Sequence, residues 1–166
     1  MTLQLIISLE VQQLFVYDCD GRGNERLVRQ FPVSTAAKGA GEQNGSYRTP
    51  RGHHRIAEKI GGDAPMYAAF RARKRTGEIW TPQLGAADPQ RDWILSRILW
   101  LAGCEVGKNQ GGILDTQARY IYIHGTHAED RIGTTCSHGC VRMNNTDIID
   151  LFDLVETGTA VNIIER

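Results

Sequence analysis

Hydrophobic and polar residues alternate at the start of the chain, and this pattern predicts a half-buried strand. The apolar positions of this segment are Leu3, Leu5, Ile7, Leu9 and Val11. Residues 14–34 carry a turn signal at Asp20-Gly21 and predict two strands around that turn. Residues 35–52 are rich in Gly, Ser and Asn and predict a loop.

The middle of the chain contains segments of three kinds. Residues 53–61 predict a short strand. Residues 61–92 carry three prolines and predict an irregular segment that can form a flap over a cleft. The apolar residues of 92–103 (DWILSRILWLAG) fit a buried helix or a buried strand, and the Trp and Ile content favours the strand.

The segment ARYIYIHGT, residues 118–126, predicts a clearer strand. Because successive side chains of a strand point to opposite faces, Ile121 and Ile123 share one face. Tyr120, Tyr122 and His124 then share the other. His124 is therefore expected at the end of the strand, on its polar face.

The best predicted helix covers residues 144–158 (NNTDIIDLFDLVETG), with Asn145 or Thr146 as its N-cap and Gly158 at its end. Its core-facing stripe, at i, i+3, i+4 and i+7, consists of Ile148, Leu151, Phe152 and Val155. Residues 160–164 (AVNII) predict a last strand. The sequence thus predicts a mainly β protein with one principal helix near the C-terminus.

Length and charge narrow the class of protein. The 166 residues fit one domain, residues 1–166, and Lys plus Arg equal Asp plus Glu at 19 each. A formal net charge of zero gives no indication of a nucleic-acid partner. No apolar run approaches the roughly 18 residues that a membrane-spanning helix needs.

The N-terminal residues do not resemble a secretory signal, because no basic residue precedes Arg22 and Glu10 interrupts the apolar stretch. We therefore expect a cytoplasmic protein whose four cysteines are thiols. A periplasmic location is the alternative if a signal peptide has been removed.

The stretch TTCSHGCVRM, residues 134–143, concentrates reactive residues. Cys140 can act as a nucleophile if a histidine takes its proton, and His124, 16 residues earlier, can supply that base and hold a thiolate–imidazolium pair. Gly139 lets the backbone approach a substrate carbonyl, where the N–H groups of Gly139 and Cys140 can serve as oxyanion donors.

Two other interpretations of the cluster remain open from the residues alone. His124, His127, Cys136 and Cys140 are ligands of the type that zinc prefers, although their spacing differs from that of common structural zinc sites. The same residues can also form an inert buried cluster. In either case the protein would be a binding domain without catalysis.

That resemblance is carried by YIYIHGT (residues 120–126) and SHGCVRM (residues 137–143), which are similar to the signature of the L,D-transpeptidase catalytic domain, the YkuD-like family. FPVSTAAKGAGEQNGSYRTPRG, residues 31–52, resembles an upstream block of the same family. The resemblance spans most of the chain and implies a β-sandwich-like catalytic domain without metal or cofactor.

The resemblance implies a role for each matching residue. Cys140 matches the nucleophile, His124 the general base, and the backbone of Gly125 the group that orients the imidazole. The motif around the nucleophile is matched by Ser137, His138 and Gly139. Two further residues are expected at the substrate: Arg142, for a bidentate contact with a carboxylate, and Tyr122, which shares the face of His124. Cys136 matches no required position and is expected to be a bystander that oxidation can join to Cys140.

The resemblance also implies an activity on muropeptide tetrapeptide stems. Cys140 would attack the bond between the diamino acid (diaminopimelate) and the terminal D-alanine and form a thioester, and carbapenems would acylate the same thiol. With the expected cytoplasmic location, the prediction is an L,D-carboxypeptidase of murein recycling, similar to short cytosolic members of the family. The first alternative is a periplasmic L,D-transpeptidase that forms 3–3 cross-links or exchanges D-amino acids. The second is a non-catalytic or zinc-stabilised domain that binds peptidoglycan fragments.

Overall fold

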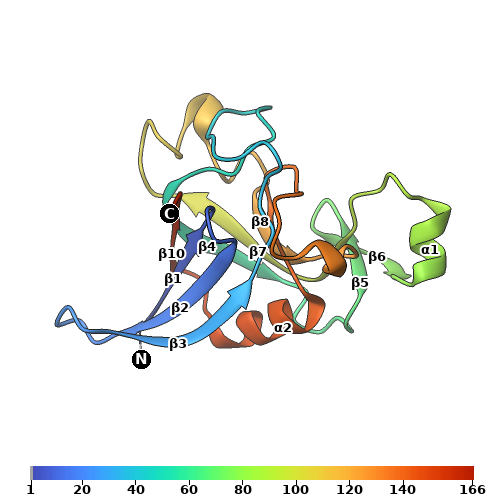
Figure 1. Ribbon diagram of the computed structural model, residues 1–166, viewed down its shortest axis with the longest axis horizontal. Coiled ribbons are helices and arrows are strands. Elements are labelled where there is room, and N and C mark those ends of the chain that lie inside the picture. The colour runs from blue at the N-terminus through green and yellow to red at the C-terminus, as the bar shows by residue number, and fades with distance from the viewer. Residues whose placement is uncertain (1) are drawn as a thin grey trace.

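The computed structural model describes residues 2–166 and contains one ten-stranded sheet, flanked by two α-helices (Figure 1). The strands are β1 Thr2–Ser8, β2 Gln13–Cys19, β3 Glu25–Pro32, β4 Gly52–Ile60, β5 Ala68–Arg71, β6 Lys74–Ile79, β7 Ile94–Gly103, β8 Tyr122–Gly125, β9 Val141–Met143 and β10 Ala160–Ile164. The helices are α1 Pro82–Ala87 and α2 Asn145–Leu154, with short 3-10 turns at Gly112–Leu114 and Glu129–Arg131. The mainly β prediction with one principal helix is confirmed.

The strands follow the order β3-β2-β1-β10-β4-β7-β5-β6, and β8 pairs with both β7 and β9. Two pairs are parallel, β1 with β10 and β8 with β9, and the other pairs are antiparallel. The hairpin of β2 and β3 and the unit of β5, β6 and α1 therefore lie at opposite ends of the molecule (Figure 1). Neither described helix is long and apolar enough to cross a membrane.

The main core lies between the sheet and α2, which packs against β7 and β8. The predicted stripe of α2 is fully or nearly fully buried in this core, together with Leu5, Ile7, Leu14 and Val16. Each such side chain contributes about 1.5–3 kcal/mol when it leaves water. This burial explains why the alternating and helical patterns could be read from the sequence.

Several boundaries differ from the prediction. The first strand ends at Ser8, and the chain turns at residues 9–12, so Leu9 and Val11 lie outside it. The turn is fixed by the left-handed Gln12 (φ 55°), whose side-chain amide donates to the carbonyl of Leu9. Strand β8 begins only at Tyr122.

The start of α2 also differs, because the N-cap position belongs to Asn144 and neither Asn145 nor Thr146 occupies it. Asn145 is the first helical residue and is fully buried. At the other end, Gly158 has a φ of 94° but lies beyond the helix, which is followed by Val155 as its C-cap.

The interpretation of residues 61–92 as irregular is wrong, since this segment contains β5, β6 and α1. Its strands were hidden because β6 is mostly exposed and charged, so it lacks an alternating apolar pattern. The strand interpretation of residues 92–103 is confirmed by β7. That strand carries a bulge near Ser96, which has a left-handed φ of 72° despite being fully buried.

Candidate active site

The short parallel pair of β8 and β9 brings the two sequence motifs together. His124 is paired with Arg142 and Ile123 with Val141. Paired residues of parallel strands point to the same face, so Ile123 and Val141 enter the main core while His124 and Arg142 share the opposite face. Cys140 directly precedes β9 and lies beside Tyr122.

His124 is fully buried and oriented by the backbone. Its Nδ1 lies 2.6 Å from the carbonyl oxygen of Gly125, an acceptor, so Nδ1 carries the proton and Nε2 is the free basic nitrogen. Nε2 has no hydrogen-bond partner among residues 2–166. Burial lowers the pKa of His124, which keeps the imidazole neutral near pH 7.

The Cys140 thiol lies between two backbone groups of the neighbouring segment. The N–H of Tyr122 donates to Sγ at 3.3 Å, and the thiol donates to the carbonyl of Tyr120 at 3.5 Å. Burial raises the pKa of Cys140 to about 12, and no hydrogen bond joins its thiol to His124. The substrate-free site therefore favours a neutral thiol and a neutral imidazole, in place of the thiolate–imidazolium pair that the sequence predicted.

The loop before Cys140 is braced by two hydroxyl groups. Ser137 Oγ donates to the carbonyl of Cys140 at 2.6 Å and accepts the N–H of Gly139 at 3.2 Å. Thr49 Oγ1 donates to the carbonyl of Gly139 at 2.9 Å. Gly139 has a φ of 132°, and a Cβ there would lie 3.3 Å from the carbonyl oxygen of Arg48, so glycine is required. The Gly139 N–H, a predicted oxyanion donor, is engaged by Ser137 in this state.

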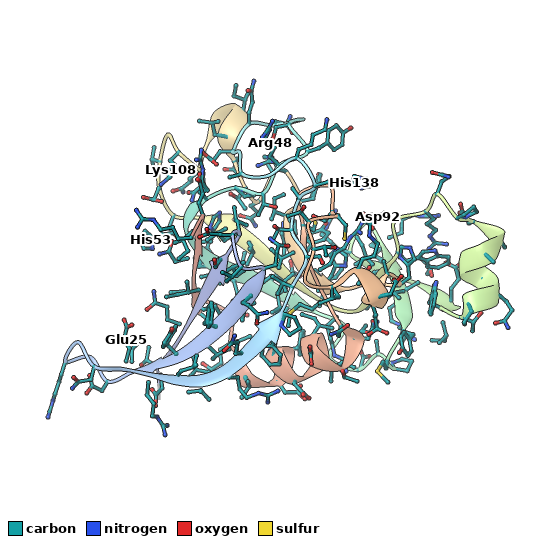
Figure 2. All side chains as sticks on the ribbon, viewed as in Figure 1. Glu25, Arg48, His53, Asp92, Lys108 and His138 are labelled. Atoms are coloured by element: carbon teal, nitrogen blue, oxygen red, sulfur yellow. The ribbon has the colours of Figure 1, made fainter. Side chains whose placement is uncertain are left out.

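Arg142 is nearly buried and has an acidic partner that sequence reasoning missed. Its Nη2 lies 2.8 Å from Oδ1 of Asp92, and Nη1 contacts the carbonyl of Cys136 at 3.4 Å. His138 Nδ1 lies 3.6 Å from the other Asp92 oxygen, and the His138 side chain is largely exposed (Figure 2). Arg142, expected to hold a substrate carboxylate, thus already holds one from the protein.

A second missed group, Asn145, supports the turn after β8. Ser96 Oγ donates to Asn145 Oδ1 at 2.6 Å, and Asn145 Nδ2 donates to the carbonyl of Thr126 at 2.8 Å. Its backbone N–H donates to Glu129 Oε2 at 2.9 Å. A Cβ on Gly125 would lie only 2.5 Å from Asn145 Oδ1, so this network packs directly against the backbone that orients His124.

The four residues of the zinc alternative do not converge. No group of three or more His, Cys, Asp or Glu side chains within residues 2–166 has an arrangement that could hold a metal ion. His127 packs against Trp80, with ring centroids 6.3 Å apart, and Cys136 Sγ lies 3.5 Å from Arg142 Nη1. All four cysteines of the chain are free thiols in the structure.

Comparison with known proteins places this geometry in a family. The family model described as the L,D-transpeptidase catalytic domain (YkuD) matches residues 3–163. The chain belongs to this family. A curated relative, the probable L,D-transpeptidase ErfK/SrfK of Escherichia coli K12, is 50% identical to this L,D-transpeptidase domain over 164 residues, which cover 98% of this chain and 44% of that protein. The chain spans less than half the length of the curated relatives it matches.

Solved structures of L,D-transpeptidases share the fold. An L,D-transpeptidase from Mycobacterium smegmatis has a TM-score of 0.55 and 18% identity, over 97% of this chain and 58% of that one. The L,D-transpeptidase LdtMt1 in complex with imipenem has a TM-score of 0.56 and 16% identity, over 98% and 58%. At these identities the likeness concerns the L,D-transpeptidase fold alone.

Proposed function

We propose that this L,D-transpeptidase domain cleaves the bond between the diamino acid and the terminal D-alanine of peptidoglycan tetrapeptide stems, through a thioester on Cys140. The observation that carries the proposal is the buried, unpartnered Nε2 of His124, on a strand whose pairing sets His124 beside Arg142, two residues after Cys140. The family membership and the 50% identical relative support the substrate class.

The proposed first step needs only these two side chains. Cys140 Sγ attacks the carbonyl carbon of the diamino acid while its proton passes to His124 Nε2. The C–N bond then breaks, and the imidazolium returns the proton to the amine of the departing D-alanine. Because both groups are neutral at rest, proton transfer accompanies the attack and is not completed before it.

For the second step we propose hydrolysis, which makes the domain an L,D-carboxypeptidase of murein recycling in the cytoplasm. Water attacks the thioester carbonyl, Nε2 takes its proton, and the proton then returns to the departing sulfur. Water needs no binding groove of its own, so the groups already described suffice. The four free cysteines support a reducing compartment.

Transfer to an amine is the second candidate, and the name of the 50% identical relative, a probable L,D-transpeptidase, favours it. An amine of another stem would then attack the same thioester and form a 3–3 cross-link in the periplasm. A well-oriented amine can exceed water by several orders of magnitude in effective molarity. The two candidates therefore differ in the acceptor and share the first step.

The test is the product spectrum of the purified protein with a disaccharide tetrapeptide, measured by mass spectrometry with and without added acceptor stems. Tripeptide and free D-alanine as main products, and native protein in the cytoplasmic fraction, would support the carboxypeptidase. Dimers with 3–3 links as main products, or recovery from the periplasm, would favour the transpeptidase. Full turnover by Cys140→Ala would refute the shared thioester step.

A further inference from the structure

A cluster of cations surrounds the turn between β5 and β6. Four of five consecutive residues are basic: Arg71, Arg73, Lys74 and Arg75. None of the four forms an ion pair with a carboxylate among residues 2–166, although the chain carries as many acidic as basic residues. The turn therefore presents positive charge that the protein itself does not neutralise.

Arg73 differs from its neighbours because its guanidinium is held in place. Cζ lies 4.9 Å from the ring centroid of Trp100 and 4.7 Å from that of Tyr120. Nη1 donates a hydrogen bond to the Tyr122 hydroxyl at 3.1 Å. Contact with two aromatic rings and one hydroxyl fixes the plane of the guanidinium and leaves its other N–H donors available.

The same two tyrosines contact the nucleophile. The backbone of Tyr120 accepts from the Cys140 thiol and the backbone of Tyr122 donates to it. Cys140 also packs in one apolar cluster with Trp100 and Tyr122. Arg73 is therefore anchored on residues that border Cys140: the side chain of Tyr122 contacts Arg73, and its backbone N–H contacts the sulfur.

The backbone of the turn that carries Arg73 is also unusual. Arg71 pairs with Lys74, so only Ala72 and Arg73 connect the two strands, and both have positive φ, 50° and 65°. Such two-residue turns normally use Asn and Gly, which adopt this conformation with little strain. Strain of this kind persists where the surrounding structure holds it and is common at ligand-binding positions.

We propose that Arg73 binds a carboxylate of the peptide stem next to the bond that Cys140 attacks, and so determines specificity for acidic stems. The inference rests on the proposed function, because it takes the tetrapeptide stem as the substrate. A planar fork with free N–H donors matches a carboxylate bidentately, and Arg73 is the cation of this turn that contacts the residues beside Cys140. The stem offers two such groups near the scissile bond: the terminal D-alanine carboxylate and the second carboxylate of diaminopimelate.

The test combines variants of the turn with modified substrates. Arg73→Gln removes the fork, Arg73→Lys keeps only the charge, and Lys74→Gln is the matched control on the same turn. We expect Arg73→Gln to lower kcat/KM for tetrapeptide by roughly 10- to 100-fold, mainly through KM, as loss of a charge-assisted hydrogen bond does. The kcat/KM of Arg73→Lys should lie between those of the wild type and Arg73→Gln. The kcat/KM of Lys74→Gln should stay within a few-fold of the wild type.

Amidated stems identify which carboxylate is bound. Amidation of that carboxylate should weaken wild-type turnover as much as Arg73→Gln does and should have little further effect on that variant. If Arg73→Gln lowered kcat/KM by the same factor on the free stem and on both singly amidated stems, Arg73 would only support the aromatic residues. That result would overturn the proposal. Unchanged kcat/KM in a folded Arg73→Gln variant would overturn it as well.

A binding measurement separates this proposal from the proposed function. Calorimetry of tetrapeptide with Cys140→Ala, with and without Arg73→Gln, reports recognition in the absence of chemistry. Binding that depends on Arg73, together with a wild type that never releases D-alanine, would support the carboxylate subsite and refute the proposed activity. Tight binding by both proteins would refute the subsite while leaving the activity standing.

Discussion

Iodoacetamide should modify Cys140 of the native protein far more slowly than an unperturbed cysteine, because only the thiolate reacts. At about pH 7.5, a pKa of about 12 leaves roughly 3 in 100,000 thiols ionised, against about one in ten for a thiol with a pKa of about 8.5. This difference in thiolate fraction alone would make native Cys140 react about 3,000-fold more slowly than the unperturbed thiol. A thiolate of higher pKa is more nucleophilic, which recovers roughly 25- to 55-fold, so native Cys140 is expected to react roughly 50- to 120-fold more slowly.

The assay is peptide-level mass spectrometry of alkylation over a series of pH values. The reference is Cys140 itself in the urea-unfolded protein, and the exposed Cys104 shows that the reagent is active on the native sample. The unfolded reference should level off above about pH 9, whereas the native rate should keep rising about tenfold per pH unit. Steric shielding alone would slow the native reaction by the same factor at every pH.

Comparable alkylation rates of native and unfolded Cys140 near neutral pH would show that the native thiol is not neutral at rest. That result would mean that His124 already holds the proton of Cys140 as a thiolate–imidazolium pair before substrate arrives. A slow, steeply pH-dependent reaction would instead place the proton transfer within the attack on the substrate.

Three other predictions concern stability and the second cysteine. Burial lowers the pKa of His54 to about 4, so this histidine is neutral in the folded protein near pH 7. About 3 kcal/mol of the free energy of unfolding that is present above pH ~6.5 should therefore be lost as the pH falls towards 4. Urea unfolding at both pH values should show a smaller loss in His54→Gln, and an unchanged pH dependence would contradict this. Gly125→Ala places a Cβ 2.5 Å from Asn145 Oδ1. The free energy of unfolding of this variant should drop by about 1–3 kcal/mol, and its release of D-alanine should fall. A variant as stable as the wild type would show that the turn adapts. Cys136→Ser should keep near-normal activity in reductant and resist mild oxidant; an inactive variant in reductant would assign Cys136 a required role.

The sequence predicted the parts of the site that are local in the chain. His124 at the end of a strand and Cys140 beside a glycine follow from alternation and from a short motif, and the pairing of β8 with β9 sets His124 beside Arg142, two residues after Cys140. The core stripe of α2 was predictable because one face of the helix must be apolar to be buried.

The missed parts depend on contacts between distant segments. Asp92 meets Arg142 from 50 residues away, and Ser96 reaches Asn145 across 49. No local pattern marks an acidic or hydroxyl residue as the partner of a distant side chain. The turn at Arg73 was missed for another reason: β5 is only four residues long, and β6 is mostly exposed, so neither strand leaves a periodic apolar signal.

The proposed thioester mechanism requires Cys140 to carry the acyl group, and intact-protein mass spectrometry during turnover detects that acyl group on the protein itself. Wild-type protein mixed with tetrapeptide and quenched in acid should gain the mass of the stem without its terminal D-alanine, and tryptic mapping should place the adduct on Cys140. A carbapenem should add its mass to the wild type at the same residue. Cys140→Ala should show neither adduct, while Cys104→Ser should show both. An adduct of the same mass that forms on Cys140→Ala at the wild-type rate would contradict the account.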